Sequence, residues 1–284
     1  MNKGLVFFIP SIEEGGVEKN LYIIANYFSK KKIDLSILTC NFNKKKKFYK
    51  KIKFIGPKHP YFYTKNRIIK TFICSIYLFF YLLKNNSKTL VFTFQSNLFS
   101  IIISKIMFTK IIARANSAPA GWTKNIFKKF FYKVIINLAD DVLVNSKDFK
   151  TNFYKFFKIK TECIYNPFDK SIIFRNIKKK QSTFKKKKSL KIISIGRLTD
   201  QKDHLTLLKA SKLINKKFNP EIIILGKGNN YKNLRNYIFE NNLERNVKLL
   251  GYQKNPYVFL KSADILVLTS KYEGLPNVLL EAQF

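Results

Sequence analysis

The sequence predicts an α/β fold in which parallel sheets are wound with helices. Short apolar runs of strand length alternate with longer helical stretches along nearly all of the 284 residues, a pattern typical of β-α-β units. A lysine-rich stretch at residues 176–189 interrupts the alternation once, and such a charge run is typical of a solvated linker or loop. The chain is also longer than one average domain. We therefore expect an N-terminal domain at residues 1–175, the linker at 176–189, and a second domain at 190–284.

The N-terminal domain begins with a buried strand and a glycine-containing turn. The turn at Glu13–Lys19 opens a helix that runs to about Lys30, and a second clear helix covers Asn125–Leu138. The uncharged run Thr71–Leu83 is shorter than the ~20 residues that cross a bilayer, so it predicts a helix that is buried or lies at a membrane interface. The expected strands are Gly4–Ile9, Ile33–Leu38, Leu90–Phe94, Ile111–Arg114, Val142–Val144 and Cys163–Tyr165.

The second domain repeats this alternation after the linker. Its expected helices are Asp203–Lys216, Tyr231–Asn241 and a last one from about Asn277. Its expected strands are Lys191–Ile195, Ile222–Leu225, Val247–Leu250 and Ile265–Leu268. Because the sequence stops soon after the last helix begins, and a sheet ending there would keep an exposed edge, we expect this domain to be incomplete.

The charge of the chain is strongly positive, with 54 Lys and Arg against 17 Asp and Glu. A biased nucleotide composition of the gene and a solvated surface would explain this, and so would attraction to a lipid headgroup surface or a phosphate-bearing acceptor. Nucleic acid is not expected as a partner, because arginine is scarce and no nucleic-acid motif occurs.

The compartment is predicted from the cysteines and the N-terminus. The three cysteines, Cys40, Cys74 and Cys163, stand singly in apolar surroundings, which indicates buried thiols in a reducing compartment. The apolar run at the N-terminus is too short for a signal peptide. A cytoplasmic location is therefore expected.

A phosphate site is indicated where the first strand of the second domain ends. Gly196 ends the strand and lets a ligand approach the backbone, while Arg197 follows it and Lys202 stands where a helix begins. Two cations beside the N-terminus of a helix favour a diphosphate. In a chain this rich in lysine the pattern is weak by itself.

A second motif lies at residues 270–281. Gly274 and Pro276 make a tight turn, with Glu273 before it and Glu281 about one turn into the following helix. Two carboxylates so placed can accept hydrogen bonds from sugar hydroxyls. Glu281 alone could instead be a charge that the helix dipole stabilises.

The motifs together resemble glycosyltransferase family 4, a family of retaining enzymes with the GT-B fold. Glu273 and Glu281 have the family's E-x7-E spacing within S-x-Y-E-G-L-P-N-x-L-L-E-A. Further matches, in the family's order, are G-G-V-E at 15–18, A-D-D-V-L-V-N-S at 139–146, Y-N-P at 165–167, I-G-R-L with Q-K at 195–202, I-L-G-K-G at 224–228 and A-D-x-L-V-L-T-S at 263–270. The resemblance implies two Rossmann-like domains facing a cleft. It also implies a C-terminal truncation, because the family normally continues past the second glutamate, and whether such a chain is active stays open.

The resemblance assigns roles to residues of the second domain. Arg197 and Lys202 would hold the donor diphosphate and neutralise the leaving group, Glu273 would contact the donor sugar, and Glu281 would bind the ribose hydroxyls. The backbone of Leu275, Pro276, Asn277 and Val278 would reach the sugar and phosphate. Gly196 would contact the donor, Gly226 and Gly228 would shape the nucleotide pocket, and Gly15 and Gly16 would approach the diphosphate from the facing domain. For Gly226 and Gly228, and for Gly15 and Gly16, the alternative is an ordinary turn that binds no ligand.

The acceptor side departs from the family. Many members have a histidine in the N-terminal domain near the acceptor, but Ile112–Pro119 contains none. His59 and His204 are expected at the surface or at a helix cap, and neither is proposed as a base. The remaining candidates for acceptor contacts are Gln95, Ser96, Asn97, Arg114, Asn116 and Ser117.

The expected function is retaining transfer of a hexose or amino-hexose from a nucleotide diphosphate sugar, with a UDP-sugar favoured. The acceptor would be a glycan or a lipid-linked glycan in the synthesis of cell-surface polysaccharide or lipopolysaccharide, at the inner face of the membrane. No cofactor and no metal are expected, because Asp140 and Asp141 lack a D-x-D context. The alternatives are a GT-B epimerase or phosphorylase, and a non-catalytic basic protein that binds a membrane or nucleic acid.

Overall fold

The computed structural model describes residues 4–13, 15–40, 48–57, 66–85, 88–95, 97–116, 125–177, 184 and 189–284. The chain divides into two compact units, Met1–Phe168 and Asp169–Phe284. The division comes before the expected boundary at residue 175, because helix α6 (Lys170–Ile177) packs against α9 (Tyr257–Ser262) of the second unit. A hydrogen bond of 2.8 Å from Asn255 Nδ2 to the carbonyl of Asn176 also ties α6 to that unit.

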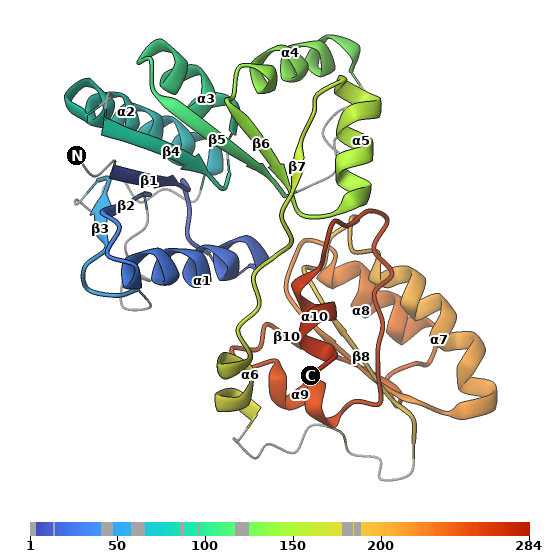
Figure 1. Ribbon diagram of the computed structural model, residues 1–284. Coiled ribbons are helices and arrows are strands. Elements are labelled where there is room, and N and C mark those ends of the chain that lie inside the picture. The colour runs from blue at the N-terminus through green and yellow to red at the C-terminus, as the bar shows by residue number, and fades with distance from the viewer. Residues whose placement is uncertain are drawn as a thin grey trace. The chain divides into compact units, whose positions relative to one another are not determined.

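The N-terminal unit contains a seven-stranded parallel sheet with the order β3-β2-β1-β4-β5-β6-β7 (Figure 1). Its strands are β1 (Gly4–Phe8), β2 (Leu35–Leu38), β3 (Lys53–Ile55), β4 (Thr89–Thr93), β5 (Lys110–Ala115), β6 (Asp141–Val144) and β7 (Glu162–Cys163). Its helices are α1 (Gly16–Lys30), α2 (Arg67–Asn85), α3 (Asn97–Ile106), α4 (Ile126–Asn137) and α5 (Lys147–Phe157). The parallel α/β fold predicted for this part is confirmed.

Alternate residues of the central strand β1 pack in two different cores, one on each side of the sheet. Leu5 and Phe7 pack with Leu21 of α1, on one side of the sheet. Val6 and Phe8 belong to the core formed with α2, α3, α4 and α5 on the other side. Figure 1 shows α1 on one side of the sheet and α2 and α3 on the other. The strand is apolar at every position because both faces are covered.

The second unit contains a four-stranded parallel sheet with the order β10-β9-β8-β11. The strands are β8 (Lys191–Ile195), β9 (Glu221–Leu225), β10 (Val247–Gly251) and β11 (Ile265–Leu266). Besides α6 and α9 the helices are α7 (His204–Phe218), α8 (Tyr231–Glu240) and α10 (Asn277–Ala282). Most of the expected linker lies outside the described residues, but Phe184 packs against a core cluster that includes Ile193 and Ile223.

In both sheets the strand order reverses at the first strand of the unit. β1 lies between β2 and β4, and β8 lies between β9 and β11. Open α/β sheets bind ligands beyond the carboxyl ends of their strands at such a reversal. The second unit therefore has its favoured binding position at the loops that follow β8 and β11.

Helix α2 is longer than the apolar run that predicted it. Its 19 residues are sufficient in length and composition to cross a membrane, but Cys74, Leu78 and Leu82 on its inner side are buried in the core of the N-terminal unit. Its outer side is exposed, with Phe72 and Phe80 among the exposed residues. The helix is thus part of the folded unit, with its inner side in the core and apolar side chains exposed on its outer side.

Candidate functional site

The loops that follow β8 and β9 are joined by backbone hydrogen bonds. The amide of Leu198 donates to the carbonyl of Lys227 at 3.1 Å, and the amide of Asn230 donates to the carbonyl of Leu198 at 3.0 Å. These bonds occupy backbone groups that would otherwise need water. They hold the residues around Arg197 in one conformation.

Glycine is required where these two loops meet. Gly226 has φ +153°, and a Cβ atom there would overlap the carbonyl oxygen of Gly196. A Cβ on Gly228 would likewise overlap the carbonyl of Leu198, while one on Gly196 would lie 3.3 Å from Lys202 Cδ. The close approach of the loops explains Gly226 and Gly228 better than an isolated turn does.

The loop after β11 is held against the segment that precedes α7. The amide of Lys271 donates to the carbonyl of Gln201 at 2.9 Å, and Gln201 Nε2 donates to the carbonyl of Tyr272 at 3.2 Å. Thr269 Oγ1 donates to the carbonyl of Asp203 at 2.8 Å. Two motifs about seventy residues apart in the sequence are therefore parts of one edge of the sheet.

This arrangement brings Lys202 and Glu273 together. The Lys202 ammonium and the Glu273 carboxylate form an ion pair and a hydrogen bond, and both side chains are largely buried. Neither motif taken alone predicts this pairing, because it depends on the folding of the loop after β11 onto the loop after β8.

Arg197 completes the positive side of this site. It is exposed, and within the described part of the chain its guanidinium has no hydrogen-bond or ion-pair partner. Arg197 and Lys202 both precede α7, whose N-terminus adds its positive dipole end. The arrangement attracts a group with two or more negative charges, such as a diphosphate.

Asp203 holds the turn between Lys202 and α7 in a left-handed conformation, with φ 45°. Its carboxylate accepts a hydrogen bond of 2.9 Å from Thr206 Oγ1, and its carbonyl accepts the hydrogen bond from Thr269. This conformation costs a non-glycine residue about 1 kcal/mol. Such residues concentrate at functional sites whose surroundings enforce the backbone.

His204 was expected at the surface or at a helix cap, and it is the first residue of α7, beside the N-cap Asp203, but it is buried. It is 3% exposed, and its Nδ1 lies 3.3 Å from Ser194 Oγ, which is itself buried in β8. Burial, and to a smaller degree the charge of Lys202, lowers the pKa of His204 below its ordinary value. The imidazole is therefore a neutral core group that joins β8 to the start of α7, because the first turn of α7 packs on the sheet.

The buried imidazole predicts acid sensitivity. Below the ordinary histidine pKa of about 6.5 the unfolded chain takes up a proton that folded His204 refuses, so the free energy of unfolding falls as the pH decreases. The expected slope from this group is at most about 1.4 kcal/mol per pH unit. Urea unfolding at pH 7.5, 6.5 and 5.5 should show a smaller slope for His204→Asn than for the unsubstituted protein. Equal slopes would show that His204 does not titrate in this way.

Helix α10 begins at Asn277 after Pro276, as the sequence predicts. Leu275, Pro276, Asn277 and Val278 are half-buried at its start. Glu281 is buried on α10, which favours a specific environment for its carboxylate over the alternative of an exposed helix charge.

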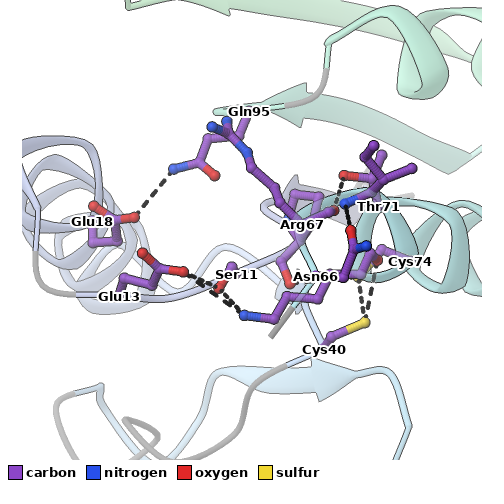
Figure 2. A network of polar contacts seen from close by, with 12 residues as sticks. Ser11, Glu13, Glu18, Cys40, Asn66, Arg67, Thr71, Cys74 and Gln95 are labelled. Atoms are coloured by element: carbon purple, nitrogen blue, oxygen red, sulfur yellow. Dashed lines mark hydrogen bonds and ion pairs between the residues drawn. The ribbon is translucent and has the colours of Figure 1, made fainter. Parts of the chain in front are cut away.

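The two N-terminal glycines begin helix α1. Gly15 is its N-cap and Gly16 its first residue. A Cβ on Gly15 would lie 2.6 Å from Glu18 Oε2, so the carboxylate of Glu18 occupies the space beside Gly15 and supplies a reason for glycine there that needs no ligand. Glu18 is buried and accepts a hydrogen bond of 3.1 Å from Gln95 Nε2 (Figure 2).

The other acceptor-side candidates form one polar network at the carboxyl ends of β4 and β5. Asn97 Nδ2 donates to the carbonyl of Arg114 at 3.0 Å, and Arg114 Nε donates to Asn116 Oδ1 at 3.3 Å. Asn116 Nδ2 in turn donates to the carbonyl of Phe94 at 2.7 Å. Ser96 and Ser117 lie outside the described residues.

Arg114 is the buried centre of that network. It is only 2% exposed, and burial lowers its pKa. Its Nη2 donates at 2.8 Å to Asn166 Oδ1, which also accepts a hydrogen bond from Asn20. In this structure Arg114 therefore holds neighbouring loops and does not present its charge to solvent. Sequence reasoning did not select Asn20 or Asn166, although Asn166 is the centre of the Y-N-P motif.

The loop after β1 carries a further polar cluster that the sequence did not indicate (Figure 2). Lys70 Nζ of α2 donates to Ser11 Oγ at 3.0 Å and lies 3.7 Å from Glu13 Oε1. Lys70 directly precedes the apolar run Thr71–Leu83, and its contact with Ser11, 59 residues away in the sequence, has no local sequence signal.

Two of the cysteines, which stand singly in the sequence, lie next to each other in the structure. Cys40 Sγ lies 3.3 Å from Cys74 Sγ, and both residues are buried free thiols. Cys163 is only half-buried. The pairing arises because the end of β2 packs against the inner side of α2.

Of the adjacent pair Asp140 and Asp141, Asp140 has a structural role. Asp140 Oδ2 accepts hydrogen bonds of 2.7 Å from both Lys105 Nζ and the amide of Ile111. Across the described ranges, no three His, Cys, Asp or Glu side chains gather in a way that could hold a metal ion.

Comparison with known proteins agrees with this architecture. Residues 175–283 match the family described as glycosyl transferases group 1. An uncharacterised glycosyltransferase of Methanocaldococcus jannaschii is 32% identical over 223 residues, which cover 68% of this chain and 52% of the relative.

An N-acetylgalactosaminyltransferase of Campylobacter jejuni, named for a diphospho-undecaprenol substrate, is 32% identical over 182 residues, or 61% of this chain and 48% of the relative. The chain thus spans about half the length of these curated relatives.

The fold is shared with solved glycosyltransferase structures. The crystal structure of HepE from Anabaena, determined with UDP-glucose, superposes with a TM-score of 0.73 at 18% identity, covering 99% of this chain and 78% of HepE. The chain therefore has the GT-B, Rossmann-like fold, and its residues 175–283 match the group 1 glycosyl transferase family.

Proposed function

We propose that the chain transfers a hexose or amino-hexose from a nucleotide diphosphate sugar, with UDP-sugars favoured as donors. The observation that carries the proposal is the cationic site at the strand reversal of the second sheet. There Lys202 is paired with Glu273, Arg197 is exposed without a partner among the described residues, and both cations precede the N-terminus of α7. A diphosphate matches this charge, and a sugar hydroxyl matches the carboxylate.

The proposed chemistry follows the charge that develops during transfer. As the bond between the sugar C1 and the donor phosphate oxygen breaks, negative charge grows on the diphosphate, where Arg197 and Lys202 stabilise it. Glu273 holds the sugar and also orients Lys202 through their ion pair. Glu281 binds the ribose, and the backbone of 275–278 reaches the sugar and phosphate.

We propose that the reaction retains the anomeric configuration by a front-face path. The acceptor hydroxyl oxygen forms its bond to C1 on the side from which the diphosphate departs, and a phosphate oxygen takes the hydroxyl proton. Such a path requires no separate base. Neutral, buried His204 is consistent with this, because its imidazole is not presented to solvent.

The acceptor is proposed to be a glycan or a lipid-linked glycan in cell-surface polysaccharide synthesis, and the enzyme to act in the cytoplasm at the inner face of the membrane. Support comes from the Campylobacter relative, whose name specifies a diphospho-undecaprenol substrate. HepE, which shares the fold, was crystallised with UDP-glucose. The basic character of the chain suits an anionic membrane surface.

The proposal is tested by a thermal-shift screen of UDP, UDP-hexoses and UDP-N-acetylhexosamines, because a ligand that binds only the folded chain raises its melting temperature. At least one UDP-sugar should raise it, and Arg197→Ala should remove the shift. A shift of the same size with inorganic sulfate, or one abolished by moderate salt, would instead support a non-catalytic basic protein.

A further inference from the structure

Three neighbouring helices of the N-terminal unit expose many large apolar side chains. On α2 and α4 these residues recur along the side that faces away from the sheet, and they are mostly phenylalanine and isoleucine. We call them, with their neighbours on α3, the three-helix face. It comprises Ile68, Ile69, Phe72, Ile76, Phe79, Phe80 and Leu83 of α2, Phe99, Ile102 and Ile106 of α3, and Ile126, Phe127, Phe130, Phe131 and Val134 of α4.

These side chains belong to one side of the unit. Helix α3 packs against α2 and also against α4, and the inner sides of all three helices contribute to a single core. Figure 1 shows the helices on one side of the sheet. Their outward side chains are therefore neighbours on a common surface. Monomeric soluble proteins rarely expose so many contiguous apolar side chains without a partner.

The helices of the three-helix face carry no acidic residue, and Asp140, which follows α4, is paired with Lys105 of α3. No aspartate or glutamate occurs in the sequence between Asp34 and Asp140, a stretch that includes all three helices. Lysines instead lie on the helices or beside them, as Lys84 at the end of α2 and Lys128 on α4 do. Both of these are exposed. Apolar side chains flanked by lysine match the headgroups and outer acyl region of an anionic bilayer.

A bilayer fits this surface better than a second copy of the chain does. A second copy would bring the same lysines toward the first, and like charges at an interface oppose association. We infer that the three-helix face docks on an anionic lipid bilayer, with phenylalanine side chains in the interface and lysines on the headgroups. The inference deepens the membrane location proposed above, but lipid binding requires neither donor nor acceptor, so the two proposals can fail separately.

The test is flotation of the full chain with vesicles of phosphatidylcholine, alone or with 30 mol% phosphatidylglycerol, without nucleotide. Binding is expected with the anionic vesicles and at least tenfold less with the neutral ones. Phe127 and Phe130 are 82% and 67% exposed, so Phe127→Ala/Phe130→Ala should weaken binding at least tenfold. Lys84→Gln/Lys128→Gln should weaken it about fivefold per lysine, the equivalent of about 1 kcal/mol each.

Matched controls exist in the second unit. Leu213 and Phe239 are 75% and 73% exposed on α7 and α8, and Leu213→Ala/Phe239→Ala should leave lipid binding unchanged. Lys209→Gln/Lys232→Gln, also on α7 and α8, controls for loss of charge. Thermal unfolding identifies any variant that does not fold. Light scattering measures the molecular mass of each variant in solution.

Equal loss of lipid binding in the control variants would overturn the inference, because binding would then depend on total charge and apolarity. Absence of binding to anionic vesicles would overturn it as well. So would a protein that scatters as a dimer and becomes monomeric in Phe127→Ala/Phe130→Ala with no change in flotation, because a second copy would then cover the face. If flotation behaves as expected but no UDP-sugar binds, the docking inference stands and the proposed transfer fails.

Discussion

Replacing Arg197 by alanine is expected to weaken UDP binding by about tenfold to a hundredfold. The guanidinium is exposed and without a partner in the described part of the chain, so the substitution should leave the fold intact and remove only a contact to the ligand. Hydrogen bonds that involve charged groups contribute about 1.5–3 kcal/mol. In a turnover assay the loss should be larger, about a hundredfold to a thousandfold, because charge on the diphosphate grows in the transition state.

Isothermal titration calorimetry of UDP with the unsubstituted protein and Arg197→Ala measures the difference. Arg235→Ala is the matched control, because Arg235 is exposed on α8 in the same unit, and it should bind UDP as the unsubstituted protein does. Lys202→Ala should weaken binding further than Arg197→Ala, since it leaves the Glu273 carboxylate unpaired beside the phosphates. Equal affinities for Arg197→Ala and Arg235→Ala would refute the placement of the diphosphate.

Replacing Gly226 by alanine is expected to destabilise the second unit by about 3 kcal/mol or more. The added methyl group would overlap the carbonyl oxygen of Gly196, and φ +153° is unfavourable for alanine. Because the carbonyl belongs to a backbone fixed by hydrogen bonds, it cannot move aside without breaking the contact between the loops after β8 and β9. UDP binding should be lost with it.

Gly251→Ala separates steric overlap from backbone strain. Gly251 also has a positive φ, at +68°, but no atom lies within 4 Å of a Cβ at that position. Its substitution should therefore cost only about 1 kcal/mol. The free energies of unfolding of the two variants are compared in urea, with hydrogen exchange measured in peptides that cover residues 191–266. Similar losses for both would show that the overlap at Gly226 is relieved at little cost.

The alternation of apolar runs was sufficient to predict the α/β fold and most strands. Runs such as Gly4–Ile9 and Lys191–Ile195 are apolar throughout, because strands of a parallel sheet are covered on both faces. Strand β3 was not predicted, since it is three residues long and only partly buried at the sheet edge. The chain divides after Phe168, before the expected boundary at residue 175, because the packing of α6 on α9 is a long-range contact without a local signal.

The residues indicated two separate motifs, which the family resemblance assigned to one donor, but the pairing of Lys202 with Glu273 was not predicted. Spacing could indicate that Arg197 and Lys202 precede a helix, but not that Glu273 would pair with Lys202. The position of His204 at the start of a helix agrees with the sequence, but its burial was not predicted, because it depends on the packing of α7 on β8. Arg114 was predicted as a possible acceptor contact. Its burial could not be predicted locally, because it depends on Asn166, far along the chain.

The central claim is that the site at Arg197, Lys202 and Glu273 serves the transfer of a sugar. The most direct measurement incubates the protein with a radiolabelled UDP-sugar, selected by the thermal-shift screen, with and without a lipid-diphosphate-linked saccharide, and then identifies the labelled products. The account predicts a labelled, α-linked saccharide that forms only when the acceptor is present and disappears in Arg197→Ala. A sugar nucleotide converted to its epimer without acceptor, or labelled product formed equally well by Arg197→Ala, would contradict it.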